Sequence, residues 1–307
     1  MRAIPILFCF DIHYASYAAV ATFSAYANST SDLKFYWVTT HNVSDLAERL
    51  KSKLEMRGID ITLVFIDVSK TIGSWREQYH LTSAAYLRLL AHEHINEEKL
   101  VYLDCDTLTL TDLRALYDTD LSNHDFAGVQ SIAPPPKAVC VDAYINSGVL
   151  LMNLAALRKI DFFEKISRLY EKYEQQLNGA DQDLINKFAE ENKLLLEPTW
   201  NCEIFSTRTN GSSFLQMARS NSILHFVGPT KPWQAWCNPV ISEFWWKYAK
   251  LTEIAEIQET RISKVGHLID LANAEHINSN YQRASSLKSQ ALSKLVSIMT
   301  ANQKNNK

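Results

Sequence analysis

Two aspartates separated by one residue, Asp104 and Asp106, directly follow the apolar run Leu-Val-Tyr-Leu at 100–103. Such a run is typical of a central strand that is buried on both faces. Side chains at i and i+2 of an extended chain point the same way, so both carboxylates can converge beyond the carboxyl end of the strand, where open α/β sheets bind ligands. Two hard oxygen ligands suit Mg²⁺ or Mn²⁺, which commonly also binds substrate phosphate oxygens. The pair predicts a divalent-metal site.

The same spacing occurs twice more, at Asp118/Asp120 and at Asp181/Asp183. About one such triplet is expected by chance in a chain of ordinary Asp content. The usual explanation is a solvated turn or the first turn of a helix, and we expect this for Asp118/Asp120. Only the Asp104/Asp106 pair follows a buried-strand pattern.

Two further stretches carry polar residues next to predicted elements. Asn146-Ser147-Gly148 reads as a turn that opens a buried strand reaching Asn153. Asn146 offers both a donor and an acceptor to a sugar, and Gly148 allows a ligand to approach the backbone closely. Asp181 is predicted to be the N-cap of a helix over 184–191, which leaves Gln182 at a helix N-terminus without a core role.

A third stretch follows the last predicted strand, 223–227. There His225 could ligate a metal, Gly228 could let backbone N–H groups approach a phosphate, and Lys231 could neutralise it. Near the N-terminus, Asp11 and His13 follow the first strand, where a nucleotide base and ribose would lie. The alternative for these two residues, a helix-capping Asp and an exposed His, stays open.

The elements that must position these residues alternate at short spacing. The pattern predicts a doubly wound, mostly parallel α/β sheet flanked by helices. No Gly-x-Gly-x-x-Gly follows the first strand, which disfavours a dinucleotide site. We expect strands over 4–10, 33–39, 59–67, 99–103, 125–130, 148–152, 193–197 and 223–227, and helices over 14–27, 43–56, 83–94, 111–116, 158–176 and 184–191.

Composition bounds the class of protein. The 307 residues, 47% apolar and 21% charged, suit one large globular domain with an appendage. A net charge of −3 gives no case for a nucleic-acid partner. Five scattered cysteines without C-x-x-C pairs argue against a disulfide framework and a zinc site, so a cytoplasmic location is expected. The N-terminal apolar run lacks a basic flank and is predicted to be a strand rather than a signal peptide.

The C-terminal region, 247–307, differs from the domain that precedes it, 1–246. From Arg261 onward there are seven basic residues against two acidic ones, a net charge of +5, so the rest of the chain carries −8. Apolar residues at helical spacing predict an amphipathic helix that could lie on an anionic membrane surface. A helix packed on its own domain or on a partner is the alternative.

Taken in order, the motifs resemble those of the family 8 glycosyltransferases, retaining enzymes that include bacterial lipopolysaccharide galactosyl- and glucosyltransferases and, more distantly, glycogenin. The similarity runs from about residue 4 to residue 236. Any single motif is weak, but the ordered set is highly specific. The matching pieces are Phe8-x-x-Asp11-x-x-Tyr14, Tyr86-x-Arg88-Leu89, Leu103-Asp104-Cys105-Asp106, Asn146-Ser147-Gly148-Val149-Leu150-Leu151, Asp181-Gln182-Asp183-Leu184-Ile185-Asn186 and His225-Phe226-x-Gly228-Pro229-x-Lys231-Pro232-Trp233.

This resemblance implies a GT-A fold and a UDP-sugar donor, UDP-glucose or UDP-galactose. It also implies Mn²⁺, with Mg²⁺ as the alternative, held by Asp104, Asp106 and His225. The acceptor would be a saccharide or a lipid-linked oligosaccharide of surface glycan synthesis. The enzyme would then work in the cytoplasm, and docking of its C-terminal region, one of the two alternatives given above, would bring it to the inner face of the membrane.

The resemblance also assigns roles to the remaining residues. Asp11 and His13 would face uridine, although His13 stands where the closest bacterial members carry Asn. Arg88, Asn146 and Ser147 would face the phosphate or sugar of the donor, and Gly228 and Lys231 would bind the diphosphate. Asp181 would hold sugar hydroxyls.

Gln182 would lie beside the anomeric carbon. Because an amide is a poor nucleophile, same-face attack by the acceptor hydroxyl is favoured, with Asp181 as nucleophile the competing version. A sugar-nucleotide nucleotidyltransferase and a non-catalytic sugar-binding protein are the alternative functions.

Overall fold

The computed structural model describes residues 2–72, 75, 83–136, 139, 141–177, 179–254, 257 and 259–305. Within this part, the chain divides into two compact units. The first comprises residues 1–203 and 221–225, and the second comprises residues 204–220 and 226–307. The boundary predicted at residue 246 from the change in charge stays a prediction.

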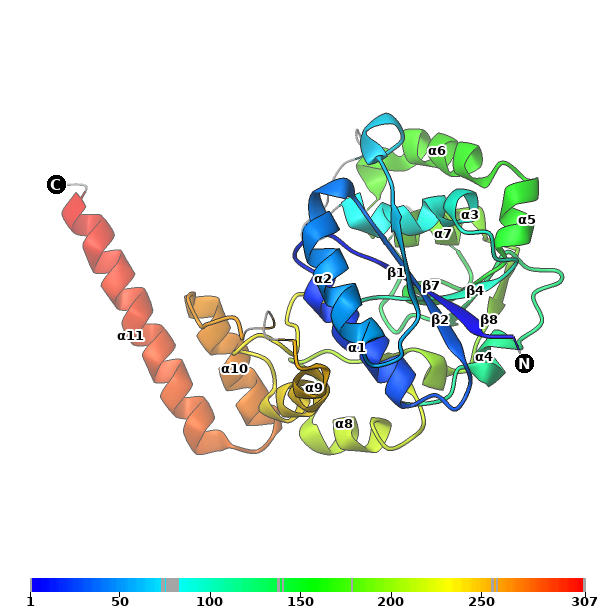
Figure 1. Ribbon diagram of the computed structural model, residues 1–307. Helices are drawn as coiled ribbons and strands as arrows, with labels where there is room; N and C mark the ends of the chain where they lie inside the picture. The colour runs from blue at the N-terminus through cyan, green and yellow to red at the C-terminus, as the bar shows by residue number, and fades with distance from the viewer. Residues whose placement is uncertain are drawn as a thin grey trace. The chain divides into compact units, whose positions relative to one another are not determined.

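A seven-stranded, mostly parallel sheet forms the centre of the first unit, as the sequence predicts (Figure 1). Strands β3, β2, β1 and β4 run parallel, whereas β7 runs antiparallel to β4 and to β6. In spatial order the strands are β3 (Ile61–Phe65), β2 (Leu33–Thr39), β1 (Ile4–Cys9), β4 (Leu100–Leu103), β7 (Ile145–Met152), β6 (Phe126–Gln130) and β8 (Lys193–Leu195).

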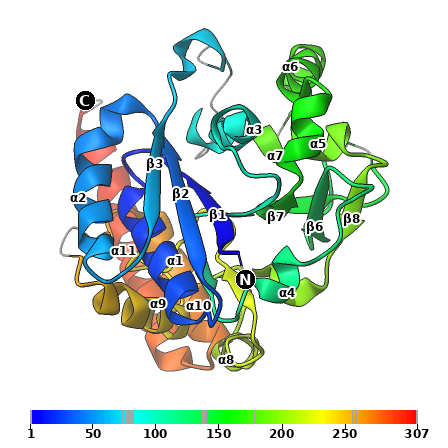
Figure 2. The same ribbon diagram turned by 45° about the vertical axis from the view of Figure 1, so that its right-hand side comes forward.

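Helices cover both faces of the sheet (Figure 2). One face carries α1 (Ala15–Ala27) and α2 (Ser44–Glu55), and the other carries α3 (Ala91–His94), α5 (Leu154–Lys159), α6 (Phe162–Tyr173) and α7 (Ala180–Phe188). Alternate side chains of each central strand therefore enter different cores. Trp37 of β2 donates its indole N–H to Thr22 of α1, whereas its neighbour Val38 lies in the cluster with Leu87 and Leu184.

A second, three-stranded sheet completes the first unit. Its strands are β5 (Thr107–Thr109), β10 (Ile223–His225) and β9 (Cys202–Glu203), with β10 in the middle. The sequence did not indicate β5 or β9, which are only three and two residues long. Pairing of β10 with β5 brings His225 opposite Thr107, one residue beyond Asp106.

Several predicted elements differ from the structure in where they begin or end, and three differ in more than their ends. The Asn146-Ser147-Gly148 stretch lies inside β7 rather than in a turn before it, because Ile145 on one side of it pairs with β6 and Val149 on the other side pairs with β4. The helix expected over 158–176 is broken at Asp161, whose φ of 48° no α-helix accommodates. Residues Ser83–Leu90 form a 3₁₀ segment that leads into α3.

The second unit is helical and comprises α8 (Gly211–Met217), α9 (Pro239–Thr252), α10 (Val265–Ile277) and α11 (Tyr281–Asn305). Helices α10 and α11 lie side by side (Figure 1) and share an apolar cluster that includes Trp236, Leu271 and Leu287. Among the described helices, none combines the length and the apolar character that crossing a bilayer requires.

Candidate functional site

The antiparallel direction of β7 decides which residues meet. Parallel strands β1 and β4 end at one edge of the sheet, and the reversed strand β7 begins there. Residues that follow β4 and residues that open β7 are therefore neighbours, although about forty positions separate them in the sequence. The backbone confirms this, because Asp104 donates its N–H to the carbonyl of Gly148 over 2.8 Å.

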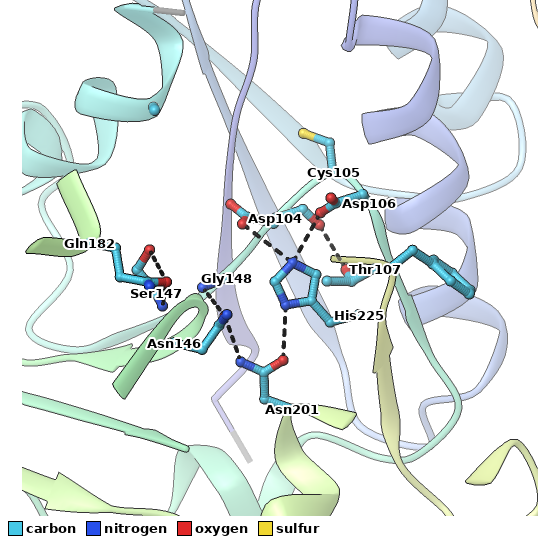
Figure 3. Close-up of polar contacts among 12 residues, drawn as sticks. Asp104, Cys105, Asp106, Thr107, Asn146, Ser147, Gly148, Gln182, Asn201 and His225 are labelled. Carbon is cyan, nitrogen blue, oxygen red and sulfur yellow. Dashed lines mark hydrogen bonds and ion pairs between the residues drawn. The ribbon is translucent and has the colours of Figure 1, made fainter. Parts of the chain in front are cut away.

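Three possible metal ligands converge at this edge (Figure 3): Asp104, Asp106 and His225. Nε2 of His225 lies 3.6 Å from Oδ2 of Asp104 and 3.3 Å from Oδ1 of Asp106. The three ligand atoms all lie within 4.8 Å of one another. Ligands at right angles on an octahedral ion, each at about 2.1 Å from it, are about 3 Å apart, so these separations fit one divalent ion.

The Gly148 backbone leaves room for this cluster. A Cβ atom built at Gly148 would lie 2.1 Å from Cε1 of His225 and 2.8 Å from Oδ2 of Asp104. Glycine at this position was expected to admit a ligand, and in the structure the groups that approach its backbone are the two side chains themselves. Any other residue here would displace the imidazole from the carboxylates.

Asp104 uses its two oxygens differently. Oδ1 accepts hydrogen bonds from Nη2 of Arg88, at 2.9 Å, and from the hydroxyl of Tyr102, at 2.5 Å. Oδ2 faces His225. Since one oxygen is fixed by the protein, the orientation of the other is set before any ligand arrives.

Arg88 is a buried cation shared among the residues of the site. Its Nη1 donates to the carbonyl of Ser147 over 2.7 Å, and its Nε lies 3.1 Å from Oδ2 of Asp181. The guanidinium also lies over the Tyr102 ring, 4.0 Å from its centroid. Arg88 was expected to face the donor, and here it links Asp104 to Asp181.

The start of α7 brings Asp181 and Gln182 to the same edge. The N-cap of α7 is Gly179, so the prediction that Asp181 caps this helix is wrong. Its side chain turns inward instead, and burial raises the pKa of Asp181 to about 6, against the opposing effect of Arg88. The entry into the helix is unusual, because Ala180 has a φ of 46°.

Gln182 has its amide oriented by two neighbours. Its Oε1 accepts the Ser147 backbone N–H over 2.9 Å, and its Nε2 donates to the Tyr144 hydroxyl over 3.0 Å. Tyr144 in turn donates to the carboxylate of Asp183, which also accepts the Gly179 N–H over 2.7 Å. The Asp183 carboxylate thereby determines which end of the Gln182 amide faces β7.

Other predicted residues lie where the chain leaves β1 or β10. Oδ1 of Asp11 accepts the backbone N–H groups of His13 and Tyr14 in the turn before α1, whose N-cap is Tyr14, so the prediction that Asp11 caps this helix is wrong. His13 is exposed, as the same alternative predicts. In the second unit, Gly228 has a φ of 82°, which favours glycine, and the ammonium of Lys231 donates to the Phe226 carbonyl over 2.8 Å.

Sequence reasoning missed two residues of this edge, Asn201 and Glu203. Asn201 is buried, and Oδ1 of its amide lies 3.0 Å from Nδ1 of His225 (Figure 3). Glu203 pairs with His225 between β9 and β10, and burial raises the pKa of its carboxyl. The only signal in the sequence was their position after Pro198, which ends the preceding strand.

Comparisons with known proteins agree with this geometry. The galactosyltransferase LgtC, solved in complex with donor and acceptor sugar analogues, superposes with a TM-score of 0.71 and 24% identity, covering 83% of this chain and 98% of LgtC. The general stress protein A of Bacillus subtilis is 25% identical over 75% of this chain and 87% of its own length. The lipopolysaccharide 1,3-galactosyltransferase of Salmonella typhimurium is 22% identical over 71% of this chain and 69% of its own length.

In three streptococcal relatives the matched part is 56%, 32% and 32% of the relative's own length. The family model described as glycosyl transferase family 8 matches residues 5–237. This range holds every residue of the sheet edge described above and covers well over half of the chain. The fold and the ordered motifs thus lead to one conclusion: the chain belongs to glycosyl transferase family 8 and is a glycosyltransferase.

Proposed function

We propose that this glycosyltransferase moves glucose or galactose from a UDP-sugar to a saccharide acceptor, with retention at the anomeric carbon, in the synthesis of lipopolysaccharide or another surface glycan. The observation that carries the proposal is the convergence of Asp104, Asp106 and His225 on one point at the carboxyl edge of the sheet. Mn²⁺ is the proposed ion, with Mg²⁺ as the alternative. Two carboxylates and one imidazole suit either ion, and the imidazole favours Mn²⁺.

Charge supports the same assignment. Asp104, Asp106 and Asp181 bring three carboxylates to this edge, and Arg88 brings one guanidinium. A divalent ion would offset that excess and, when bound, would stabilise the negative charge on the departing diphosphate. Gly228 and Lys231, which follow His225 closely in the chain, are proposed to bind the same diphosphate.

The sugar is proposed to lie against the opening of β7 and the start of α7. Asn146, Ser147 and Asp181 would contact its hydroxyls, and Arg88 would hold the Asp104 and Asp181 carboxylates in place beside it. Asp11 and His13, after β1, would face the uridine.

Retention is proposed to follow from attack on the same face that the diphosphate leaves. The acceptor hydroxyl forms the new bond to the anomeric carbon as the sugar–phosphate bond breaks, and its proton passes to a diphosphate oxygen. Gln182 would place its amide oxygen, already oriented by Ser147, near the positive charge that develops at that carbon. Asp181 is less suited to be a nucleophile, because Arg88 and the Ser147 hydroxyl hold the same oxygen, Oδ2.

The test is a screen of UDP-sugars with Mn²⁺ and a saccharide acceptor, followed by determination of the anomeric configuration of the product. Turnover of UDP-glucose or UDP-galactose that stops in chelator and returns with Mn²⁺ would support the proposal. Release of pyrophosphate from a nucleoside triphosphate would indicate a nucleotidyltransferase instead. Sugar binding without any turnover would indicate a binding protein.

Helix α11 supports a second proposal, reversible docking at the inner face of the membrane. Its first half packs on α10 through Leu287 and Ala291. Its second half leaves apolar side chains exposed at helical spacing, at Leu292, Leu295, Val296 and Met299. Basic residues on such a helix are attracted to anionic headgroups by about 1 kcal/mol each.

Removal of residues 293–307 tests this docking without disturbing the cluster shared with α10. The shortened chain should sediment less with anionic vesicles than the full chain does, and salt should weaken the binding of the full chain. Turnover with a short soluble acceptor should be unchanged. Equal vesicle binding by both chains would show that the helix serves the fold or a protein contact.

A further inference from the structure

The two ring nitrogens of His225 face different neighbours. Nε2 faces Asp104 and Asp106, and Nδ1 lies 3.0 Å from Oδ1 of Asn201. A neutral imidazole carries its single proton on one of these nitrogens, and only the other can ligate a metal. Whether His225 can serve the proposed metal centre depends on where that proton lies.

An asparagine beside an imidazole does not by itself decide this, because its amide can present either oxygen or nitrogen. Here the backbone of β7 decides. The N–H of Gly148 donates to the Asn146 side chain over 2.9 Å, so the accepting atom must be its oxygen.

The same Asn146 oxygen lies 3.0 Å from the Asn201 amide, which must therefore direct its Nδ2 donor toward Asn146 (Figure 3). The Asn201 oxygen is then the atom that faces Nδ1 of His225, and an oxygen can only accept. Each direction follows from a backbone N–H that cannot change its role.

We propose that Asn201 is a positioning residue that holds the proton of His225 on Nδ1 and leaves the Nε2 lone pair directed at the metal position between Asp104 and Asp106. This deepens the metal centre proposed above and rests on it. Asn201 and His225 are both nearly inaccessible to solvent, at 3% and 4% exposure, so water does not replace the amide as the acceptor. Partners of this kind commonly account for 10–100-fold in metal affinity.

The experiment is a titration of the folded full chain with Mn²⁺, by calorimetry or by the electron paramagnetic resonance of free Mn²⁺, with and without UDP. Asn201→Ala should bind Mn²⁺ about 10–100-fold more weakly than the unaltered chain. Asn153→Ala is the matched control. Asn153 lies just beyond the other end of β7, where its amide caps α5 and donates to two carbonyls, so its loss should lower stability and leave Mn²⁺ affinity unchanged.

Asn201→Asp separates the positioning role from a merely structural one. A carboxylate still accepts from Nδ1 of His225 but faces the Asn146 oxygen with a second oxygen, which should lower the melting temperature. The proposal predicts that Mn²⁺ affinity nevertheless stays close to that of the unaltered chain. If affinity instead fell together with melting temperature across both Asn201 variants, the role would be structural and the proposal would be wrong.

The tautomer of His225 can also be determined directly in the unaltered, metal-free chain, by two-bond ¹H–¹⁵N correlation spectra of its histidines. The His225→Ala variant identifies the resonances of His225, because they are missing from its spectrum. Protonation of His225 at Nδ1 is the expected result, and protonation at Nε2 would overturn the proposal even if a variant failed to fold. A chain that bound no Mn²⁺ with or without UDP would refute the metal centre itself. Normal binding with an unaffected Asn201→Ala variant would refute only the role of Asn201.

Discussion

The acidic pair after β4 and the acidic pair in α7 have the same spacing in sequence and opposite arrangements in space. After a strand, residues i and i+2 point the same way, and both Asp104 and Asp106 face Nε2 of His225. In an α-helix, residues i and i+2 are about 200° apart around the axis. Asp181 accordingly contacts Arg88, whereas Asp183 turns away to the Gly179 N–H and the Tyr144 hydroxyl.

The difference teaches that a short acidic motif acquires its chemistry from the backbone that carries it. The third pair illustrates the remaining case. Asp118 is the C-cap of α4 (Arg114–Tyr117), and Asp120 accepts the backbone N–H of Ser122 in a turn, as expected from the sequence. One pattern thus gives a ligand pair, a divided pair and a pair of turn residues.

The largest effect should come from the pair after β4. Asp106→Ala should lower kcat by about 1000-fold or more, because loss of a ligand forfeits several kcal/mol of stabilisation of the leaving group. The fold should persist, since Asp106 follows the strand rather than contributing to the apolar core. Initial rates with Mn²⁺ and far-ultraviolet circular dichroism are the measurements. His225→Ala should have a smaller effect, because water can take the place of a third ligand. Undiminished transfer by Asp106→Ala would remove this pair from the site.

Gln182 lies between the two members of the α7 pair. Variants of Gln182 test whether its amide stabilises the charge at the anomeric carbon without forming a covalent bond. Gln182→Ala should lower kcat by about 100-fold and leave the product configuration retained. Intact-mass measurement of Gln182→Glu during turnover should show no glycosyl adduct. An adduct on the unaltered Gln182 would establish a covalent mechanism and reverse the interpretation.

Asp183, the member of the α7 pair that turns away from Arg88, should affect stability and leave metal binding unchanged. Asp183→Ala leaves the Tyr144 hydroxyl and the Gly179 N–H without their acceptor, which should lower the free energy of unfolding by about 2–3 kcal/mol. Urea denaturation measures this. Mn²⁺ affinity should not change, because the Tyr144 hydroxyl and the Gly179 N–H that donate to Asp183 do not belong to the proposed ligand set. A variant of unaltered stability but weakened metal binding would contradict the division of the pair.

The smallest effect is a difference between the pKa values of two carboxyls, Asp181 and Asp120, measured from their ¹³C resonances as a function of pH. Burial raises the pKa of Asp181 to about 6, whereas two hydrogen bonds from Ser122 lower the pKa of Asp120 from its ordinary value. Between about pH 4 and 6 the folded state therefore holds more protons at Asp181 than the unfolded state does. The contribution of Asp181 to stability falls as pH rises through this window, and that of Asp120 is lost as pH falls through its lowered pKa. Equal midpoints for the two carboxyls would contradict this comparison.

Much of the fold could be predicted from the sequence, because apolar runs such as the one before Asp104 carry the strand signal within themselves. The reversal of β7 could not be predicted, since a strand buried on both faces has the same composition whichever way it runs. Asn, Ser and Gly are residues that favour turns, so the sequence predicts a turn at Asn146-Ser147-Gly148 where the structure has the first part of β7.

The proposed ligands could be identified from their residue types and their places after strands. Arg88 as the link between Asp104 and Asp181 could not, because both partners lie far from it in the sequence and meet it only through the sheet. For Asn201 the sequence offered only its position after Pro198. Its role depends on the direction of one hydrogen bond, and that direction is fixed by the Gly148 N–H on another strand.

His225 reaches the sheet edge on the short segment 221–225, which returns to the first unit after residues 204–220 have entered the second. This order has a consequence for biosynthesis. Chains fold from the N-terminus as they are made, at roughly 5–20 residues per second. The 119 residues that follow Asp106, up to and including His225, therefore take roughly 6–24 s to synthesise. During that time the nascent sheet presents two carboxylates and no imidazole. The ribosome thus delivers a sheet edge that gains its third proposed ligand only after most of the first unit has been made.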